Sequence, residues 1–383
     1  MLVCIADRER HSGHYVASNQ LYERAIQIVR PMQAHQRLGA VLNNFAINVF
    51  NQAQLDRAER VFREALQNFQ AVGDQHNTGV ALANIADILA LRGRLDEAAT
   101  MYHKAWESTE MALPQPGYAH YRYALARLMQ GRPEEAFREA ELSVEACRKL
   151  NKPDDVAGGL VVVGNIQMAK GDLVASRRSY EEALETQTKL GNLDDGAETK
   201  YALADLALAE GNPEKGEALV REAIAQLEKG QNILDHIAVY TTLSRVLQAE
   251  GKLEDASKAI DHAAELVGAN DLKNFPGVAT PVRIQQARVT GSLAATDAHG
   301  QPKVAAARTD LMALAAAARR LGLFSFECDA RTALGEFEMK TNPDTGRQHL
   351  ASLAVYARDH GFALIATRAT ALQNLMAAQA RSK

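Results

Sequence analysis

The chain has 383 residues and a formal net charge of −4. This balance gives no electrostatic case for nucleic acid, which favours a basic stripe. No apolar run approaches the ~20 residues of a membrane helix, and the apolar start at Met1 is too short for a signal peptide. Cys4, Cys147 and Cys328 fit no disulfide or zinc spacing, so we expect a cytoplasmic protein without metal or cofactor.

The first predicted helical hairpin is incomplete. Counted back from Gly13, Met1 falls just inside a helix that lacks its N-terminal turn. Either Met1 is an internal point of a longer natural polypeptide, or the first helix starts short. We favour a longer polypeptide, because the terminal repeats of solenoids normally carry a polar cap. An effector domain would then precede this segment.

A hairpin unit then recurs along the chain, and residues 82–106 show it well. They predict a helix, a tight turn at Gly93 and a second helix. A Gly at such a turn ends a helix in the left-handed conformation at little steric cost. The turn position recurs every 38 or 40 residues, at Gly13, Ala53, Gly93, Gly131, Gly171, Gly211, Gly251 and Gly291.

Small residues keep register with these turns. They precede the turn at Ala6, Ala46, Ala86, Ala124, Gly164, Ala204 and Ser244, and follow it at Ser18, Ala58, Ala98, Ala136, Ser176, Gly216 and Ala256. A third set is Ala25, Ala65, Ala105, Ser143, Ala183, Ala223 and Ala263. Between the last two sets lie Tyr22, Phe62, Tyr102, Ala140, Tyr180, Val220 and Ile260. Small side chains let two helices approach closely, and a larger one fills the space beside them.

These columns resemble the tetratricopeptide repeat (TPR), whose usual period is about 34 residues. The longer period is similar to the 40-residue subclass found in cargo adaptors, polarity scaffolds and bacterial regulators. The resemblance implies an all-α, right-handed superhelical solenoid of antiparallel helix pairs, with about eight hairpins and a capping helix.

The later part of the chain departs from this register. Residues 1–291 are expected to form regular repeats, and residues 292–383 degenerate repeats with a C-terminal capping helix. We expect a loop at 294–303 and helices at 304–321, 324–340, 346–360 and 363–379. Residues 353–365 look like the end of the repeat half of large bacterial regulators, in which a kinase or DNA-binding domain comes first.

The sequence carries no catalytic constellation. It has no phosphate-binding glycine loop, no Gly-x-Ser-x-Gly elbow and no His-Glu-x-x-His metal motif. Paired carboxylates such as Glu134 and Glu135 are expected on solvated helix faces. We therefore expect that the protein is not an enzyme.

The first helices of such hairpins line a concave groove. Helical geometry directs toward it Asn43, Asn44, Asn84, Asp87, Tyr121, Arg122, Asn165, Tyr201, Asp205, Thr241 and Arg245, and Tyr118 joins them as a candidate aromatic anchor. Within the family, asparagines at this place grip a bound peptide's backbone, because an amide both donates and accepts. Packing within the repeat is the competing role for the asparagines and the tyrosines.

Two functions therefore stay open. The first is a scaffold that binds a protein or peptide in the concave groove. The second is the sensory half of a bacterial signalling protein, a Ser/Thr kinase or a transcriptional regulator, which binds a partner or a small effector and controls a domain absent from this chain.

Overall fold

The structure is a computed structural model, and it describes residues 1–11, 14–112, 117–228, 232–295 and 299–381. These residues form nineteen α-helices and two short 3₁₀ helices. The N-terminal half contains α1 Leu2–His11, α2 Tyr15–Val29, η1 Arg30–Met32, α3 His35–Asn51, α4 Leu55–Ala71, α5 Gln75–Leu91, α6 Leu95–Ala112, α7 Tyr118–Met129, α8 Pro133–Lys149, α9 Pro153–Ala169 and α10 Leu173–Leu190. The C-terminal half contains α11 Leu193–Ala209, α12 Pro213–Leu227, α13 Ile233–Ala249, α14 Leu253–Ala269, η2 Leu272–Asn274, α15 Pro276–Ala294, α16 Gln301–Arg320, α17 Phe324–Thr341, α18 Pro343–Asp359 and α19 Ala363–Arg381.

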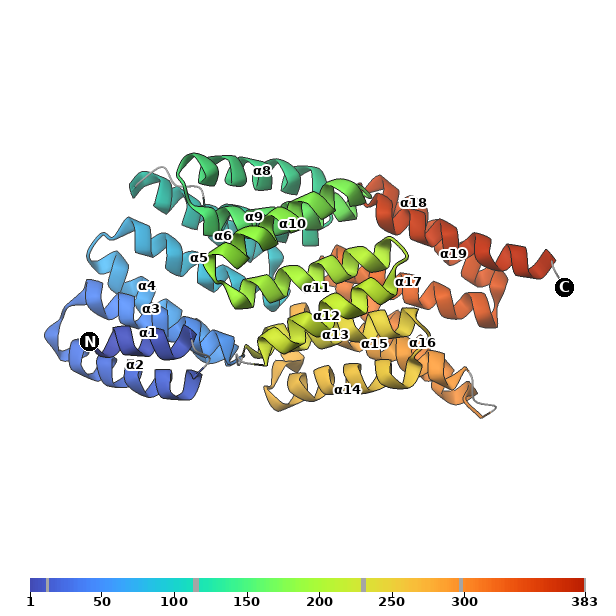
Figure 1. Cartoon of the computed structure of the whole chain (residues 1–383), viewed down its shortest axis with the longest axis horizontal. Helices are drawn as coiled ribbons and strands as arrows, with labels where there is room; N and C mark the ends of the chain where they lie inside the picture. The colour runs from blue at the N-terminus through green and yellow to red at the C-terminus, as the bar shows by residue number, and fades with distance from the viewer. Residues whose placement is uncertain (12–13, 113–116, 229–231, 296–298, 382–383) are drawn as a thin grey trace.

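The described helices pair into nine antiparallel hairpins, from α1–α2 to α17–α18, followed by α19 (Figure 1). This confirms the predicted all-α solenoid, with one hairpin more than expected. The first helix is short, as predicted, with ten residues against seventeen in α3 and α5. The four predicted C-terminal helices are present as α16 to α19.

The expected columns of small residues lie at the closest helix contacts. Ala46, Ala86 and Ala204 have no solvent exposure. A Cβ added to Gly164 would lie 2.5 Å from the ring of Tyr180, so the aromatic side chain occupies the space that the missing side chain leaves. Where a serine replaces alanine, its hydroxyl is satisfied across the hairpin, as when Ser244 donates to the carbonyl of Ala256 at 2.8 Å.

The turns between paired helices use the left-handed conformation. φ is 58° at Ala53, 74° at Gly93 and 81° at Gly131, and the turn glycines of the next three hairpins have the same sign. The predicted turn at Gly13 falls outside the described residues. Glycine suits these turns because it has no Cβ to clash at positive φ.

The predicted turn at Gly291 is wrong. Gly291 lies inside α15, and a Cβ there would stand 2.4 Å from the ring of Phe337. It is a site of close packing between α15 and α17, and the turn of this hairpin comes after Ala294. A missing Cβ suits both a turn with positive φ and a close helix contact. The spacing of the glycines alone therefore did not distinguish the two.

The superhelix winds back onto itself. Helices ten apart in the chain contact each other, in the pairs α5–α15, α7–α17 and α9–α19. The turn glycines make part of this contact: a Cβ on Gly131 would lie 2.7 Å from Phe324, and one on Gly171 would lie 3.4 Å from Ala363. Where α5 meets α15, Arg92 stacks over Phe275 with its guanidinium 4.8 Å from the ring centre. The two halves are therefore packed together, and α19 covers both α18 and part of α9.

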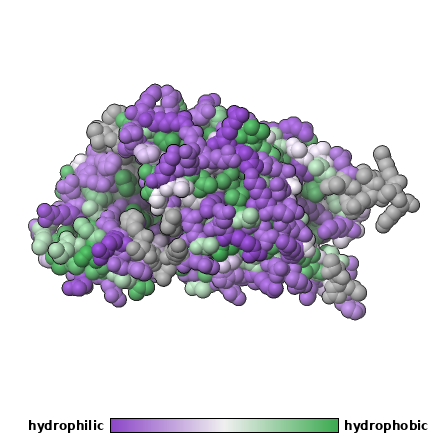
Figure 2. Space-filling model, viewed as in Figure 1, coloured by the Kyte–Doolittle hydropathy of each residue, from purple (hydrophilic) through white to green (hydrophobic). Residues whose placement is uncertain are grey.

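The outer face in Figure 2 is mainly hydrophilic, with apolar side chains in small separate areas. Charged residues on the second helices of the hairpins pair across neighbouring repeats, as Arg57 does with Glu23 at 2.8 Å. No helix of the described ranges is long and apolar enough to cross a membrane.

Candidate functional site

The odd-numbered helices α3, α5, α7 and α9 place their polar inner faces side by side. Asn84 Nδ2 on α5 donates to Asn43 Oδ1 on α3 at 3.0 Å, and Asn44 Nδ2 donates to Asp7 on α1 at 3.3 Å. The predicted groove asparagines are therefore linked from repeat to repeat. Neither amide is fully engaged by these bonds, because each can make further ones.

Asp87 is the centre of the most connected cluster. Its carboxylate accepts hydrogen bonds from Tyr102 Oη at 2.5 Å, from Arg122 Nε at 2.8 Å and from Tyr118 Oη. The Asp87 side chain is almost completely buried, and Arg122 supplies the compensating charge. Burial first, and then the nearby Asp87 charge, raise the pKa of both tyrosines well above the ordinary value, so they remain hydrogen-bond donors.

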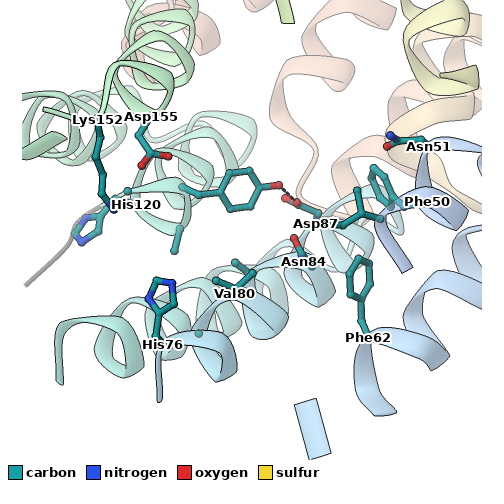
Figure 3. Close-up of a pocket in the computed structure, with 16 residues that line it drawn as sticks. Phe50, Asn51, Phe62, His76, Val80, Asn84, Asp87, His120, Lys152 and Asp155 are labelled. Carbon is teal, nitrogen blue, oxygen red and sulfur yellow. Dashed lines mark hydrogen bonds between the residues drawn. The ribbon is translucent and has the colours of Figure 1, made fainter. Parts of the chain in front are cut away.

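A cavity of about 470 Å³ lies beside this cluster, between α3, α5, α7 and α9. Figure 3 shows Phe50, Phe62 and Asn51 at one end, and His120, Lys152 and Asp155 at the other. Val80, Asn84 and Asp87 lie between the two ends. The remaining lining residues are Ile47, His76, Gly79, Ala83, Gly117, Tyr118 and Ala119.

The cavity runs diagonally across the inner face. It begins at the C-terminal end of α3, crosses the middle of α5 and the start of α7, and finishes at the first turn of α9. Three of the predicted groove residues line it, namely Asn84, Asp87 and Tyr118. Asn43, Tyr121 and Arg122 contact these three residues, whereas Asn44 bonds Asp7, and neither Asn44 nor Asp7 is among the lining residues.

The other predicted residues lie further along the superhelix, away from the cavity lining. Asn165 accepts a hydrogen bond from Tyr180 at 2.6 Å, and Arg245 pairs with Asp205 at 2.6 Å. Thr241 turns its hydroxyl back to the carbonyl of Ile237, four residues earlier in the same helix. Burial raises the pKa of Tyr201 well above the ordinary value, and the negative charge of Glu198 adds to this effect. None of these residues lines the cavity between α3, α5, α7 and α9.

Sequence reasoning missed most of the lining residues. Phe50 and Asn51 lie two helical turns beyond the positions chosen on α3, and Val80 and His76 lie one and two turns before Asn84 on α5. The signal that could have found them is the full inner stripe at i, i+3, i+4 and i+7. Lys152 and Asp155 carried no separate signal, because they enter the cavity only through the packing of α9 against α7.

The fold and this cavity define a TPR superhelix with a ligand-sized pocket on its concave face. The sequence profile of the MalT-like TPR region matches residues 108–309, and a tetratricopeptide repeat profile matches residues 37–110. The first match covers more than half of the chain. The chain therefore belongs to the MalT-like TPR family.

Solved structures with the same fold are similar over most of this chain. One is a Rap protein complexed with Competence and Sporulation Factor, at 13% identity and a TM-score of 0.54, covering 89% of this chain and 99% of that one. Another is the Rap conjugation gene regulator of the plasmid pLS20 in complex with the Phr* peptide, at 14% identity, a TM-score of 0.59, and coverage of 92% and 96%.

A third similar structure belongs to a larger protein. It is a signal transduction ATPase with numerous domains (STAND) and a tetratricopeptide repeat sensor, from Pyrococcus horikoshii, at 16% identity and a TM-score of 0.50. The match covers 94% of this chain and 55% of that one. At such identities the likeness shows the fold alone. No curated protein matches the chain significantly.

Proposed function

We propose that the chain is a non-catalytic binding scaffold that holds a peptide or an extended protein segment in the cavity between α3, α5, α7 and α9. The single observation that carries this proposal is the cavity itself, an apolar trough with amide and charged groups at its edges. Pockets of this size and composition are typical of ligand sites. The Rap complexes with Competence and Sporulation Factor and with Phr* peptide support it by analogy of fold.

The dimensions suit an extended segment. Neighbouring packed helices are about 8–10 Å apart and an extended chain advances ~3.3 Å per residue, so a crossing from α3 to α9 needs about eight residues. Asn51 and Asn84 lie along this path with side-chain amides able to bond a peptide backbone. Side chains of a bound segment would alternate between the trough and solvent.

The second function that the sequence left open is the sensory half of a signalling protein. The observation that favours it is the STAND protein, in which a tetratricopeptide repeat sensor is one part of a longer chain. Ligand binding in the cavity is common to both functions. They differ in whether an effector domain responds, and the cytoplasmic location expected from the sequence stays a prediction in either case.

A displayed library of random nine-residue peptides tests the proposal. Peptides selected on the wild-type chain are labelled, and their affinity is measured by fluorescence polarisation for wild type and for Val80→Trp, which fills the trough. We expect Val80→Trp to weaken binding by at least about tenfold. Val174→Trp is the matched control, because Val174 is 64% exposed on α10, outside the cavity lining.

Wild type offers a second readout that needs no label. Trp106 is the one tryptophan of the sequence, and its ring lies 3.9 Å from the ring of His120, which lines the cavity. A peptide in the cavity should change the Trp106 emission. Selected peptides that bind Val80→Trp as tightly as wild type, without changing this emission, would overturn the proposal.

A further inference from the structure

The hydrogen-bond donors that line the cavity make more bonds within the protein than the acceptors do. Its donors are largely used within the protein: Asn84 Nδ2 bonds Asn43, Asn51 Nδ2 bonds the hydroxyl of Tyr15 at 3.4 Å, and Tyr118 Oη bonds Asp87. His120 and Lys152 also have partners in the protein. His76, at the exposed rim, lies in the field of Asp74. A ligand therefore meets one remaining N–H on each of Asn51 and Asn84, whereas the Tyr118 hydroxyl already donates within the protein.

Several hydrogen-bond acceptors of the cavity are without a partner among the described residues. The Oδ1 atoms of Asn51 and Asn84 accept none of the hydrogen bonds found among the described residues, and the half-buried carboxylate of Asp155 forms no ion pair or hydrogen bond with them. A half-buried carboxylate without a hydrogen-bonding partner is costly, since desolvation is not repaid. Burial raises the pKa of Asp155, and Lys152 opposes this only in part.

The acidic character continues beyond the cavity on the next inner helix. Glu198 on α11 forms no ion pair or hydrogen bond among the described residues, and the cation that acts on it is Arg122. Arg122 is already bonded to Asp87. The surroundings are enclosed enough for burial to raise the pKa of Glu198, although its side chain is exposed to solvent. The α9 end of the cavity thus carries the Asp155 carboxylate without a bonded partner among the described residues, and Glu198 lies outside the lining on α11.

The opposite end is apolar. Ile47, Phe50, Phe62 and Val80 line the trough where α3 meets α5, and the only charged lining group between them and Tyr118 is the neutralised Asp87. Bulky apolar side chains gain free energy by entering such a place, roughly in proportion to the area removed from water. The α3 end of the cavity therefore favours an apolar group, and the α9 end favours a positively charged one.

We infer that the cavity takes an extended peptide with a bulky apolar side chain at the α3 end and a positively charged group at Asp155. This rests on the proposed function and specifies its ligand. The positive group is a Lys or Arg side chain or a free amino terminus, since each is a cationic donor that the free acceptors of the cavity can receive. The distance between the two ends places the two groups several residues apart in the peptide.

A double-mutant cycle tests this inference. The starting peptides are those from the library that Val80→Trp excludes. In the selected set we expect Lys or Arg, or a dependence on the free amino terminus, a few residues from an apolar side chain. Replacing the Lys by norleucine, or acetylating the amino terminus where no Lys or Arg is present, should weaken binding to wild type by about tenfold. The same change should have little effect on Asp155→Asn, because the carboxylate is already gone.

Asp154→Asn is the matched control. Asp154 is the adjacent residue, exposed, and bonded to Asn192, so the removed charge is the same but does not face the cavity. It should leave the effect of norleucine unchanged. Equal losses from norleucine in wild type and Asp155→Asn, or selection of acidic peptides, would overturn the inference while the proposed function stands. Absence of any peptide excluded by Val80→Trp would instead overturn the proposed function.

Discussion

The two halves of the superhelix pack their helices in the same way, but they differ in how the polar side chains of their inner faces are paired. In the C-terminal half, two inner-face arginines are paired with carboxylates: Arg245 pairs with Asp205, and the buried Arg288 pairs with Asp329 and Glu336, whereas the exposed Glu198 on α11 has no bonded partner among the described residues. In the N-terminal half, the Asp87 cluster is also satisfied, but Asn51, Asn84 and Asp155 keep free acceptors around a cavity. This difference is why the proposed binding site falls in the N-terminal half, where acceptors without partners among the described residues line a cavity.

The largest expected effect comes from removing the arginine at the centre of an ion-pair cluster in the C-terminal half. Arg288→Met removes a buried arginine, so that the partly buried Asp329 loses this cation and Glu336 keeps only Arg368, which should lower the free energy of unfolding by about 3 kcal/mol. Urea unfolding of the full chain measures it. Arg347→Met, which removes an exposed arginine paired with Asp344, should change the free energy of unfolding by less than about 1 kcal/mol. Equal effects would mean that burial does not distinguish the two pairs.

Overpacking a close helix contact should lower the free energy of unfolding by a similar amount in both halves. Ala86 and Ala204 occupy the same column and have no exposure, so Ala86→Trp and Ala204→Trp should each overpack a helix contact and cost at least about 1–3 kcal/mol. Thermal melting of the two variants measures the loss. Unchanged melting of either would show that this register of close contacts is misassigned.

Equivalent carboxylates in the two halves should differ in their effect on binding. Asp87→Asn and Asp205→Asn each remove the charge that faces an arginine, and each should cost about 1.5–3 kcal/mol of stability. Asp87→Asn also frees Tyr118 in the cavity wall, so it should weaken the selected peptides, whereas Asp205→Asn should not. Parallel unfolding and polarisation measurements separate the two outcomes, and similar peptide affinities would contradict the comparison.

The smallest effect concerns the outer face. Hydrogen bonds from Lys252, and then from Arg221, hold the pKa of Glu217 at about 2. Its folded pKa is lower than its unfolded value, so its stabilisation is complete above about pH 4.5 and is lost as the pH falls toward about 2, by roughly 1 kcal/mol because both partners are largely exposed.

Urea unfolding at several pH values checks this, with Glu217→Gln as the comparison. The variant should lose less stability than wild type between about pH 5 and pH 3. A slope identical to that of wild type would show that this ion cluster does not contribute to the acid sensitivity of the fold.

Most of the fold could be predicted from the sequence. The columns through Ala86, Ala98 and Tyr102 identify close helix contacts because small and large side chains must alternate where two helices touch. The presence of α16 to α19 also followed from local patterns, although α16 and α18 each begin three residues earlier than predicted, at Gln301 and Pro343. The winding of the superhelix back onto itself did not, since the contacts between α7 and α17 join residues about two hundred positions apart and depend on small rotations summed over five hairpins.

The candidate site divides in the same way. The sequence by itself determined that Asn84 and Asp87 share one side of a helix, because the period of an α-helix fixes which side chains lie together. Only the tertiary structure decided that Asp87 is bonded to three donors, that Gly291 packs against Phe337, and that Lys152 and Asp155 reach the cavity. The physical reason is that pairing and desolvation depend on distances between helices, which no local pattern encodes.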